Sequence, residues 1–535
     1  MKIKNEVSNS KLIVITALFL VLFGNMTFVN NVTRIYPFNL ENSIFLVSLI
    51  IFLLCINILL LSTVCFKRTI KPILITLLLI SSLAAYFMDT YNVVIDELMI
   101  DNIVKTDTNE ALDLFSFKQV LYLLLLGVLP SILIYKVKIV EKPFKKAILS
   151  NVILFFTALL MAILIVVSLS NYYASFFREH KTLRYYANPS YYIYSASKHI
   201  NSFIKSAPQA LIKVGLGAQT PPSDEHRELI IFVVGETARA DHFSLNGYHK
   251  KTNPLLEKEN VISFNNVASC GTSTAYSVPC MFSIYNRSDF NNIKGQSTEN
   301  ALDILKRAGV NVIWLDNNSS SKGVADRIEY HDFKSSRENS VCDIECRDEG
   351  MLANLQNYID SHPSGDIFIV LHQMGNHGPA YYKRYPKAFE KFTPTCQTNQ
   401  LEQCSQDEIN NTYDNALLYT DYFLSKAIKI LKNNDSKFES ALFYVSDHGE
   451  SLGENNLYLH GLPYMIAPKE QTQVPMIMWF GNSFDKDEIN FEQLKSKKQQ
   501  KLSHDNIFHT ILGLMEVQTD VYNKTMDIIG HKNYD

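Results

Sequence analysis

Apolar residues are spaced differently in the two halves of this 535-residue chain. Up to about residue 169 the sequence is dominated by long apolar runs. Beyond about residue 224, short apolar runs alternate with helical patterns of polar and apolar positions, which is typical of a sheet covered by helices. The pattern therefore predicts an α-helical membrane domain followed by a soluble α/β domain.

Five apolar stretches approach or reach the roughly 17–25 residues that a membrane-spanning helix needs. They cover residues 12–29, 44–66, 73–88, 119–135 and 148–170, and the third is the shortest. The first follows three lysines, as in a secretion signal, but no small-residue cleavage site follows it cleanly. Since four more stretches come after it, we expect the first to be an anchor.

Loop charges indicate how these spans are oriented. The N-terminal tail and the loops after the second and fourth spans are rich in lysine, whereas residues 89–118 carry seven acidic residues and two lysines. Lysine-rich loops remain in the cytoplasm. We therefore expect the acidic loop and the whole polar half on the outer side of the membrane.

A tyrosine-rich connector follows the last span. Its aromatic and basic residues suit the headgroup layer, so we expect amphipathic helices on the outer membrane surface; a plain linker is the alternative. The predicted division is a five-span domain over 1–170, interfacial helices and linker over 171–223, and a catalytic α/β domain over 224–535.

Candidate metal ligands follow the predicted strands of the polar half. Strands are expected at 229–234, 310–315, 367–372, 441–445 and 475–480. In open α/β sheets, sites collect beyond the carboxyl ends of the strands. The residues placed near such ends are Glu236, His377, Asp447, His448 and His460. This mixture of carboxylates and imidazoles favours zinc, and an oxygen-rich site would also accept manganese.

A hydroxyl-rich loop lies between Cys270 and Cys280. Its hydroxyl groups belong to Thr272, Ser273, Thr274 and Ser277. Phosphoryl-type transfer needs an oxygen nucleophile held still, and a divalent cation stabilises its alkoxide. Spacing alone does not choose among the four hydroxyls, and a Ser/Thr-rich surface loop with a structural disulfide is the alternative.

The six cysteines of the polar half form three close pairs in sequence. An even set of this kind suggests disulfides and an oxidising compartment. A structural zinc site is the alternative, but CxxC knuckles with nearby paired histidines are missing. The net charge of −3 gives no indication of a nucleic-acid partner.

Seven ordered motifs make the chain resemble a known family. They are VVGETARADHFSLNGY (233–248), CGTSTAYSVPCMFS (270–283), LDNNSSSKGV (315–324), CDIECRDEGM (342–351), HQMGNHGPAYYKRYP (372–386), SDHGESLGENNLYLHG (446–461) and SHDNIFHT (503–510). The chain resembles the lipid A phosphoethanolamine transferases, including the chromosomal and mobile colistin-resistance enzymes. These belong to the alkaline phosphatase/sulfatase-like superfamily, so the resemblance implies that fold for the outer domain.

The resemblance also implies roles for individual residues. Thr274 matches the nucleophile, and the first zinc site matches Glu236, Thr274, Asp447 and His448. His377 and His460 match histidines near the substrate and any second zinc. Lys322, Asn318 and Ser319 match residues that hold the phosphoethanolamine group of the donor. The family disulfides match Cys270, Cys280, Cys342, Cys346, Cys396 and Cys404.

The implied activity is zinc-dependent transfer of phosphoethanolamine from phosphatidylethanolamine to a lipid A phosphate through a phosphoethanolamine-threonine intermediate. Diacylglycerol would be released and polymyxin resistance conferred by a monomeric, multi-pass protein of the bacterial inner membrane with a periplasmic catalytic domain. Another acceptor, such as a lipooligosaccharide core sugar or a protein, stays open.

Two other classes of protein share some of these features. Sulfatases and lipoteichoic acid synthases share the plan of a metal and a hydroxyl, but a sulfatase would need a CxPxR or SxPxR string, which is missing around residue 270. A membrane sensor or transporter is the second alternative. Few charges lie within the spans, so the sequence shows no translocation path.

Overall fold

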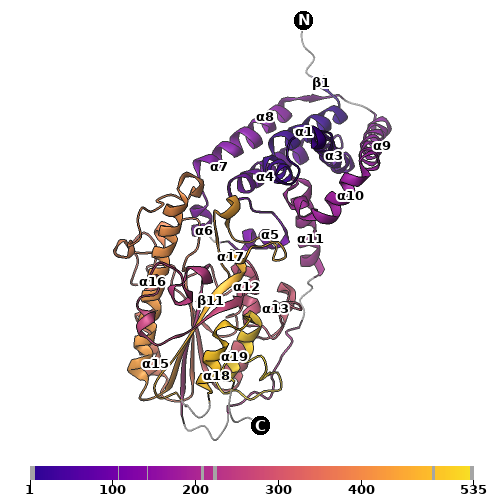
Figure 1. The fold of residues 1–535 in the computed structure, drawn as a ribbon. Helices are drawn as coiled ribbons and strands as arrows, with labels where there is room; N and C mark the ends of the chain where they lie inside the picture. The colour runs from indigo at the N-terminus through magenta and orange to yellow at the C-terminus, as the bar shows by residue number, and fades with distance from the viewer. Residues whose placement is uncertain are drawn as a thin grey trace. The chain divides into compact units, whose positions relative to one another are not determined.

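The computed structural model describes residues 6–106, 108–140, 143–205, 210–220, 226–484 and 489–530 (Figure 1). The chain divides into two compact units. The first comprises Met1–Ile100 and Phe115–Lys205, and the second comprises Asp101–Leu114 and Ser206–Asp535. The domain boundaries expected at 170 and 223 stay predictions, and 206–209 and 221–223 of the expected linker lie outside the described residues.

Apolar helices build the first unit. By length and composition, four of its described helical stretches are able to cross a membrane, or five if one bent pair counts as a single span. They are α3 (Leu40–Val64), α4 (Ile70–Tyr91), the continuous α7–η1–α8 stretch (Phe117–Lys136) and α9 (Phe144–Ser168). These correspond to the second to fifth predicted spans.

The first predicted span is a bent pair. Helix α1 (Asn9–Phe23) and helix α2 (Met26–Ile35) meet at an angle of 58°. Asn25 lies at the break, where its side-chain amide donates to the carbonyl oxygens of Leu20 at 2.9 Å and Asn188 at 2.7 Å. The side chain thus satisfies backbone groups that an uninterrupted helix would have satisfied itself.

The tyrosine-rich connector is helical, as expected, over α10 (Ser170–Glu179), η2 (Lys181–Tyr186) and α11 (Ser190–Lys205). Part of its aromatic surface packs inside the first unit. Tyr173 and Phe176 are buried against Phe45 of α3, and the Tyr173 hydroxyl lies 3.1 Å from that of Ser48. Placement of these helices on a membrane surface stays a prediction.

An eight-stranded sheet forms the centre of the second unit, in the order β12-β4-β11-β8-β3-β7-β5-β6. The five predicted strands are β3 (Glu228–Gly235), β5 (Asn311–Asp316), β7 (Ile367–His372), β8 (Glu439–Ser446) and β11 (Gln473–Phe480). Strand β11 runs antiparallel to both neighbours, and the other pairs are parallel. The largely parallel sheet expected from the sequence is therefore confirmed.

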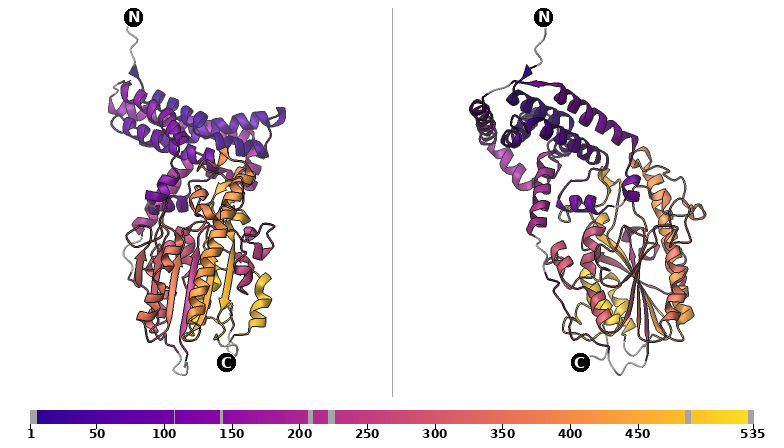
Figure 2. Two further views of the ribbon diagram at one scale, coloured as in Figure 1. Left: turned by 90° about the vertical axis from the view of Figure 1, so that its left-hand side faces the viewer. Right: turned by 180° about the vertical axis from the view of Figure 1, so that it is seen from behind.

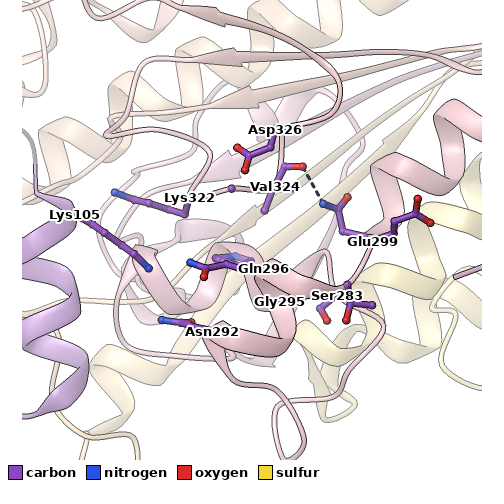
Figure 3. A pocket seen from close by; sticks show the side chains of 13 residues that line it. Lys105, Ser283, Asn292, Gly295, Gln296, Glu299, Lys322, Val324 and Asp326 are labelled. Carbon is purple, nitrogen blue, oxygen red and sulfur yellow. Dashed lines mark hydrogen bonds between the residues drawn. The ribbon is translucent and has the colours of Figure 1, made fainter. Parts of the chain in front are cut away.

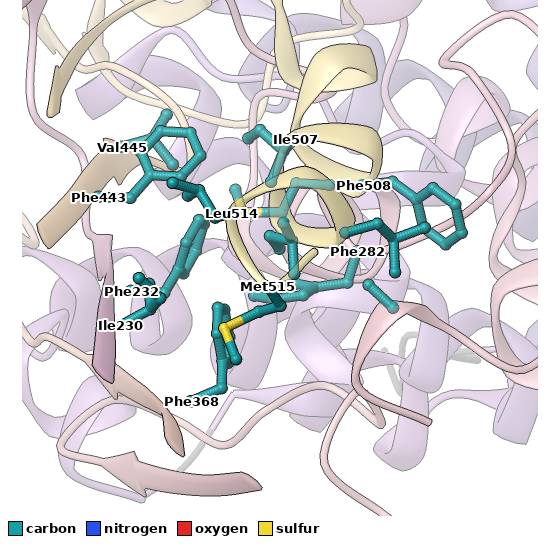
Figure 4. Packing of buried hydrophobic residues seen from close by; sticks show 14 of the residues in the cluster. Ile230, Phe232, Phe282, Phe368, Phe443, Val445, Ile507, Phe508, Leu514 and Met515 are labelled. Atoms are coloured by element: carbon teal, nitrogen blue, oxygen red, sulfur yellow. The ribbon is translucent and has the colours of Figure 1, made fainter. Parts of the chain in front are cut away.

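Helices cover both faces of this sheet (Figure 2). Helix α16 (Gln406–Asn434) covers one face, and α12 (Thr274–Met281), α14 (Ala301–Arg307) and α19 (Ile507–Leu514) cover the other. The central strands β3, β7 and β8 are buried along their whole length, which explains their continuous apolar runs. Figure 4 shows Phe232 and Phe443 of the sheet in one cluster with Phe508 of α19.

Shorter elements connect this framework. They are β4 (Ile262–Ala268), α13 (Asn292–Ser297), β6 (Glu329–Asp332), α15 (Leu355–Ser361), β9 (Ser451–Leu452), β10 (Tyr458–Leu459), α17 (Lys469–Thr472), α18 (Phe491–Ser496) and β12 (Leu502–Ser503). The apolar pattern of the sequence did not predict β4, β6 or β12. Strand β6 is exposed along its length, so it lacks the apolar run by which the central strands were found.

One segment of the second unit comes from the acidic loop between two spans. Helix α5 (Glu97–Lys105) ends in it, and α6 (Thr108–Asp113) lies within it. Asp101 accepts a hydrogen bond from the Asn292 amide at 2.8 Å, and Asp113 forms ion pairs with Lys383 and Arg384. These contacts explain why Asp101–Leu114 groups with the second unit.

Candidate active site

The ends of β3 and β8 bring three predicted ligands together. Glu236 follows β3, and Asp447 and His448 follow β8, which is its parallel neighbour in the sheet. One ligand atom from each of the three lies within 4.8 Å of the others. All three side chains are buried, so the strand ends form a compact cluster of donor atoms shielded from solvent.

The hydrogen bond of His448 determines which ring nitrogen faces this cluster. Its Nδ1 lies 2.9 Å from the carbonyl oxygen of Gly449, which only accepts, so Nδ1 carries the proton. Its Nε2 lies 3.5 Å from Glu236 Oε1 and 3.3 Å from Asp447 Oδ2. Burial lowers the pKa of His448 well below its usual value, which leaves a lone pair on Nε2 facing the carboxylates.

One oxygen of each carboxylate lacks the hydrogen-bond partner that a buried charge normally requires. Glu236 Oε1 and Asp447 Oδ2 accept no hydrogen bond from any residue that the structure describes. Burial raises the pKa of both, and the neighbouring Asp447 charge raises that of Glu236 further. Two buried oxygens and an imidazole lone pair converging on one point fit a divalent cation, which would offset their repulsion.

Thr274 brings a hydroxyl to the same cluster. It opens helix α12, and its Oγ1 donates to Glu236 Oε2 at 3.1 Å and lies 3.4 Å from His448 Nε2. The hydroxyl of Thr272 instead donates to the Leu462 carbonyl, and that of Ser277 accepts from the Gly271 amide. Of these three hydroxyls, only that of Thr274 has a described contact with the cluster, which spacing in the sequence did not reveal.

Several contacts fix the loop that carries Thr274. A disulfide joins Cys270 to Cys280, and the structure also forms the predicted Cys342–Cys346 and Cys396–Cys404 bonds. His504 is fully buried and bridges the loop to β8. Its Nδ1 accepts from the Cys270 amide at 3.0 Å, and its Nε2 lies 3.0 Å from the carbonyl oxygen of Ser446.

The loop after β5 positions the predicted donor-binding residues. The side-chain amide of Asn318 donates to Glu236 Oε2 and to the Gln373 carbonyl, each at 2.8 Å, so Asn318 orients a metal-ligand candidate. Lys322 Nζ donates to Ser319 Oγ at 2.6 Å. Burial lowers the pKa of Lys322, while the nearby Glu110 and Glu236 charges oppose that change.

His377 and His460 lie beside the cluster. The ring centroids of His460 and His448 are 4.3 Å apart, and those of His460 and His377 are 5.6 Å apart. His460 Nδ1 lies 3.2 Å from Glu450 Oε1. Burial opposes protonation of His460, but the Glu450 carboxylate raises its pKa above the usual value.

Glu110 also lies at this candidate site, although no motif in the sequence indicated it. Its Oε1 lies 3.2 Å from His377 Nε2. Burial opposes its ionisation, but the hydrogen bond from His377 and the charges of His377, Lys322 and His460 lower the pKa of Glu110 to about 2. In the sequence, the charge of the acidic loop indicates only the orientation of the spans, because no local signal reveals that the loop reaches strand ends more than 200 residues away.

Two cavities adjoin the site. One of about 500 Å³ shares Glu110, Asn318, Ser319 and His377 with it. The other, shown in Figure 3, lies beyond Lys322 and Lys105 and measures about 40 Å³. The smaller cavity has no room for a lipid headgroup.

Two family models match the chain. The model described as Sulfatase matches residues 228–517, which hold the sheet and the cluster. The model described as Phosphoethanolamine transferase EptA/EptB matches residues 53–203. The two matches divide the chain between an apolar and a polar part, as the hydrophobic pattern does.

Close relatives match nearly the whole chain. Phosphatidylethanolamine transferase Mcr-1 of Escherichia coli is 42% identical over 97% of this chain and 96% of its own. Phosphoethanolamine transferase EptA of Escherichia coli strain K12 is 39% identical over the same shares. The structure of the integral membrane lipooligosaccharide phosphoethanolamine transferase A from Neisseria meningitidis superposes with a TM-score of 0.95 at 36% identity, covering 98% of this chain and 99% of that one.

Proposed function

The chain belongs to the phosphoethanolamine transferase family of EptA and Mcr-1, and from that membership we propose that it transfers phosphoethanolamine from phosphatidylethanolamine to a lipid A phosphate. The observation that carries the proposal is the Thr274 hydroxyl, 3.1 Å from Glu236 Oε2 and beside two carboxylate oxygens that accept no hydrogen bond within the described residues. A hydroxyl held in such surroundings suits covalent phosphoryl transfer.

The proposed reaction has two steps, which form and then consume a covalent intermediate on Thr274. First, Thr274 Oγ1 attacks the phosphorus of phosphatidylethanolamine, the bond from phosphorus to the glycerol oxygen breaks, and diacylglycerol leaves with a proton. Second, an oxygen of a lipid A phosphate attacks the same phosphorus, the bond to Thr274 breaks, and Thr274 recovers a proton. The threonine ends unchanged, so the enzyme alternates between free and phosphoethanolamine-bearing forms.

Glu236, Thr274, Asp447 and His448 would hold zinc. When bound there, the ion would lower the pKa of the Thr274 hydroxyl and offset charge on the transferring group. Asn318 orients Glu236, and the Gly449 carbonyl orients His448, so both candidate ligands are held in position by hydrogen bonds. A second zinc near His377 and His460 stays a prediction.

Lys322 and Glu110 suit the two ends of the phosphoethanolamine group. The Lys322 ammonium, with Ser319, would bind phosphate oxygens, and the Glu110 carboxylate would bind the ethanolamine ammonium. His460 is our candidate for protonating the departing glycerol oxygen, because Glu450 raises its pKa and holds its Nδ1. His377, which contacts Glu110, is the second candidate for proton transfer.

The proposed location is the bacterial inner membrane, with the second unit in the periplasm and the enzyme acting as a monomer. There the donor and the acceptor are both lipids of the same membrane. Adding ethanolamine to lipid A masks anionic charge, which would weaken the attraction of cationic polymyxins and confer resistance.

Mass spectrometry of lipid A tests this function. Cells that express the full chain should contain lipid A heavier by one phosphoethanolamine group, and cells with the Thr274→Ala variant should not. Unchanged lipid A in the presence of expressed protein would contradict the proposed acceptor. Transfer of phosphoethanolamine to a core sugar or a protein instead would support the proposed reaction but show that the acceptor is not lipid A.

A further inference from the structure

The turn after β3 holds a threonine in the left-handed region of backbone conformation. Thr237 directly follows Glu236, has a φ of 49° and is fully buried. A β-branched residue rarely adopts this conformation, because its side chain crowds the backbone. The Thr237 hydroxyl forms no hydrogen bond with any described residue, so it does not stabilise the turn. Groups outside the turn must therefore keep Thr237 in this conformation.

The turn directs the Thr237 amide at a candidate metal ligand. The Thr237 N–H donates to Asp447 Oδ1 at 3.2 Å, and the His448 N–H donates to the same oxygen at 2.7 Å. These two bonds occupy Oδ1 and fix the carboxylate, which leaves Oδ2 for the strand-end cluster of Glu236, Asp447 and His448. The conformation of Thr237 thus affects how Asp447 is oriented.

A tyrosine of helix α16 binds the other side of the turn. The hydroxyl of Tyr413 donates to the Thr237 carbonyl at 2.7 Å and accepts from the Arg239 N–H at 2.9 Å. Burial raises the pKa of Tyr413 well above its usual value, so the hydroxyl keeps the proton that it donates. The relative directions of the Thr237 N–H and C=O depend on its φ and ψ. Their bonds to Asp447 and Tyr413 therefore hold Thr237 at positive φ together.

Tyr413 is itself fixed by its surroundings. The side-chain amide of Asn376 donates to the Tyr413 carbonyl at 3.1 Å, and the Asn376 N–H donates to the Glu236 carbonyl at 3.1 Å. The Tyr413 ring packs edge-on against Tyr381 and His242, with centroids 5.6 Å and 5.2 Å away. The hydroxyl is thus presented to the turn by a closely packed side chain.

We propose that Tyr413 is a positioning residue for the metal site, whose hydroxyl holds Thr237 in the left-handed turn that orients Asp447. The inference rests on the proposed function, since it requires the strand-end cluster to hold zinc. Tyr413 does not line the larger cavity, so it acts through the turn and not on the substrate. Loss of its hydroxyl should therefore weaken zinc binding and slow the chemical step without weakening substrate binding.

Two tyrosines and one threonine provide matched variants. Tyr413→Phe removes the hydroxyl and keeps the ring. Tyr444→Phe is the control, because Tyr444 is also fully buried on neighbouring β8 and its hydroxyl forms no hydrogen bond within the described residues. Thr237→Gly, added to Tyr413→Phe, introduces a residue that adopts positive φ without steric cost. Glycine does not replace the lost hydrogen bonds, so recovery would report the conformation alone.

Competition with a chelator of known affinity would measure zinc binding by the full-length enzymes. We expect the zinc Kd to rise about tenfold in Tyr413→Phe, as when other residues that orient metal ligands are changed. It should stay within about twofold of wild type in Tyr444→Phe, and Thr237→Gly should restore most of the affinity lost in Tyr413→Phe. At saturating zinc, intact-mass measurements should show slower adduct formation in Tyr413→Phe, with KM for phosphatidylethanolamine unchanged.

Wild-type zinc affinity in Tyr413→Phe would overturn the proposal. Weaker affinity that Thr237→Gly does not restore would also overturn it, because a lost backbone conformation would not be the cause. If Tyr413→Phe does not fold, as judged by circular dichroism, the double variant must fold and bind zinc for the proposal to stand. Failure of the proposed function gives a different result: the wild-type enzyme itself would bind no zinc or form no adduct.

Discussion

Two clusters of buried charge in the second unit differ in how their charges are satisfied. Around Arg384, each carboxylate has a cation: Asp113 pairs with Arg384 and Lys383, and Glu345 pairs with Arg384. At the strand ends, Glu236 and Asp447 face a single imidazole whose pKa is lowered, and each has an oxygen that accepts no hydrogen bond within the described residues.

The comparison separates a cluster whose charges the protein itself balances from a candidate metal site. Desolvated charges are stable when the protein supplies the opposite charge, as it does around Arg384. An excess of negative charge with aligned lone pairs indicates that the missing cation comes from outside the chain. Each cluster contains two carboxylates, so the balance of charge, and not the presence of acidic residues, is the informative property.

Removal of a bound metal should have the largest effect, and it should act on the strand-end cluster and not on the Arg384 cluster. We expect a chelator to abolish transferase activity, by roughly a thousandfold or more, because the Thr274 hydroxyl loses the charge that activates it. The melting temperature should fall and recover when zinc is restored. Full activity after exhaustive chelation, with metal removal verified by elemental analysis, would show that the strand-end cluster needs no external cation for the reaction.

Neutralising one carboxylate should stabilise the metal-free strand-end cluster and destabilise the Arg384 cluster. In metal-free protein, Asp447→Asn should raise the free energy of unfolding by about 1 kcal/mol, because it relieves repulsion with Glu236. The same variant should lose zinc-dependent stabilisation and most activity. Thermal unfolding with and without zinc measures both effects, and destabilisation of the metal-free variant would contradict the account.

Asp113→Asn should instead destabilise its cluster. It removes one partner of Arg384, whose side chain is 3% exposed, while Glu345 remains. We expect a loss of about 2 kcal/mol in the contacts that hold Asp101–Leu114, less than the cost of breaking an isolated buried pair. Hydrogen exchange should become faster in that segment, and unchanged exchange would show that the pair has no structural role.

Glu110→Gln should reduce activity less than chelation or Asp447→Asn does. We expect KM for phosphatidylethanolamine to rise about tenfold, equivalent to about 1.4 kcal/mol of binding, with a smaller change in kcat. The reason is loss of the carboxylate that would bind the ethanolamine ammonium. Equal losses in binding of phosphatidylethanolamine and of an uncharged analogue would exclude that role.

The lowered pKa of Glu110 also predicts that the stability of the segment Asp101–Leu114 depends on pH. Its pKa in the folded protein is lowered to about 2 from an ordinary 4.5. The carboxylate therefore stabilises the folded arrangement above pH 4.5, and this contribution is lost as the pH falls toward 2. Hydrogen exchange in Asp101–Leu114 should accelerate over that range more in wild type than in Glu110→Gln.

Much of the fold was predictable because its signals are local. Long apolar runs located the second to fifth spans, and buried central strands appeared as short apolar runs. Strand β6 is exposed and β12 has two residues, so neither carries such a signal. The bend between α1 and α2 depends on hydrogen bonds from Asn25, including one to Asn188 far along the chain.

The site was predictable where it follows strand ends. Glu236, Asp447 and His448 meet as the parallel order of strands implies. Spacing in the sequence did not distinguish Thr274 from Thr272, because their hydrogen-bond partners, such as Leu462, 190 residues from Thr272, are set by the fold. Glu110 was missed for the same physical reason, since its place depends on the fold of another part of the chain.

Intact-mass analysis of the full-length enzyme with phosphatidylethanolamine tests the central claim most directly. We predict a gain of one phosphoethanolamine group on Thr274, its absence after chelation, and its loss when lipid A is added. Persistence of the same mass gain in Thr274→Ala, or no gain in zinc-loaded wild-type protein, would contradict the account.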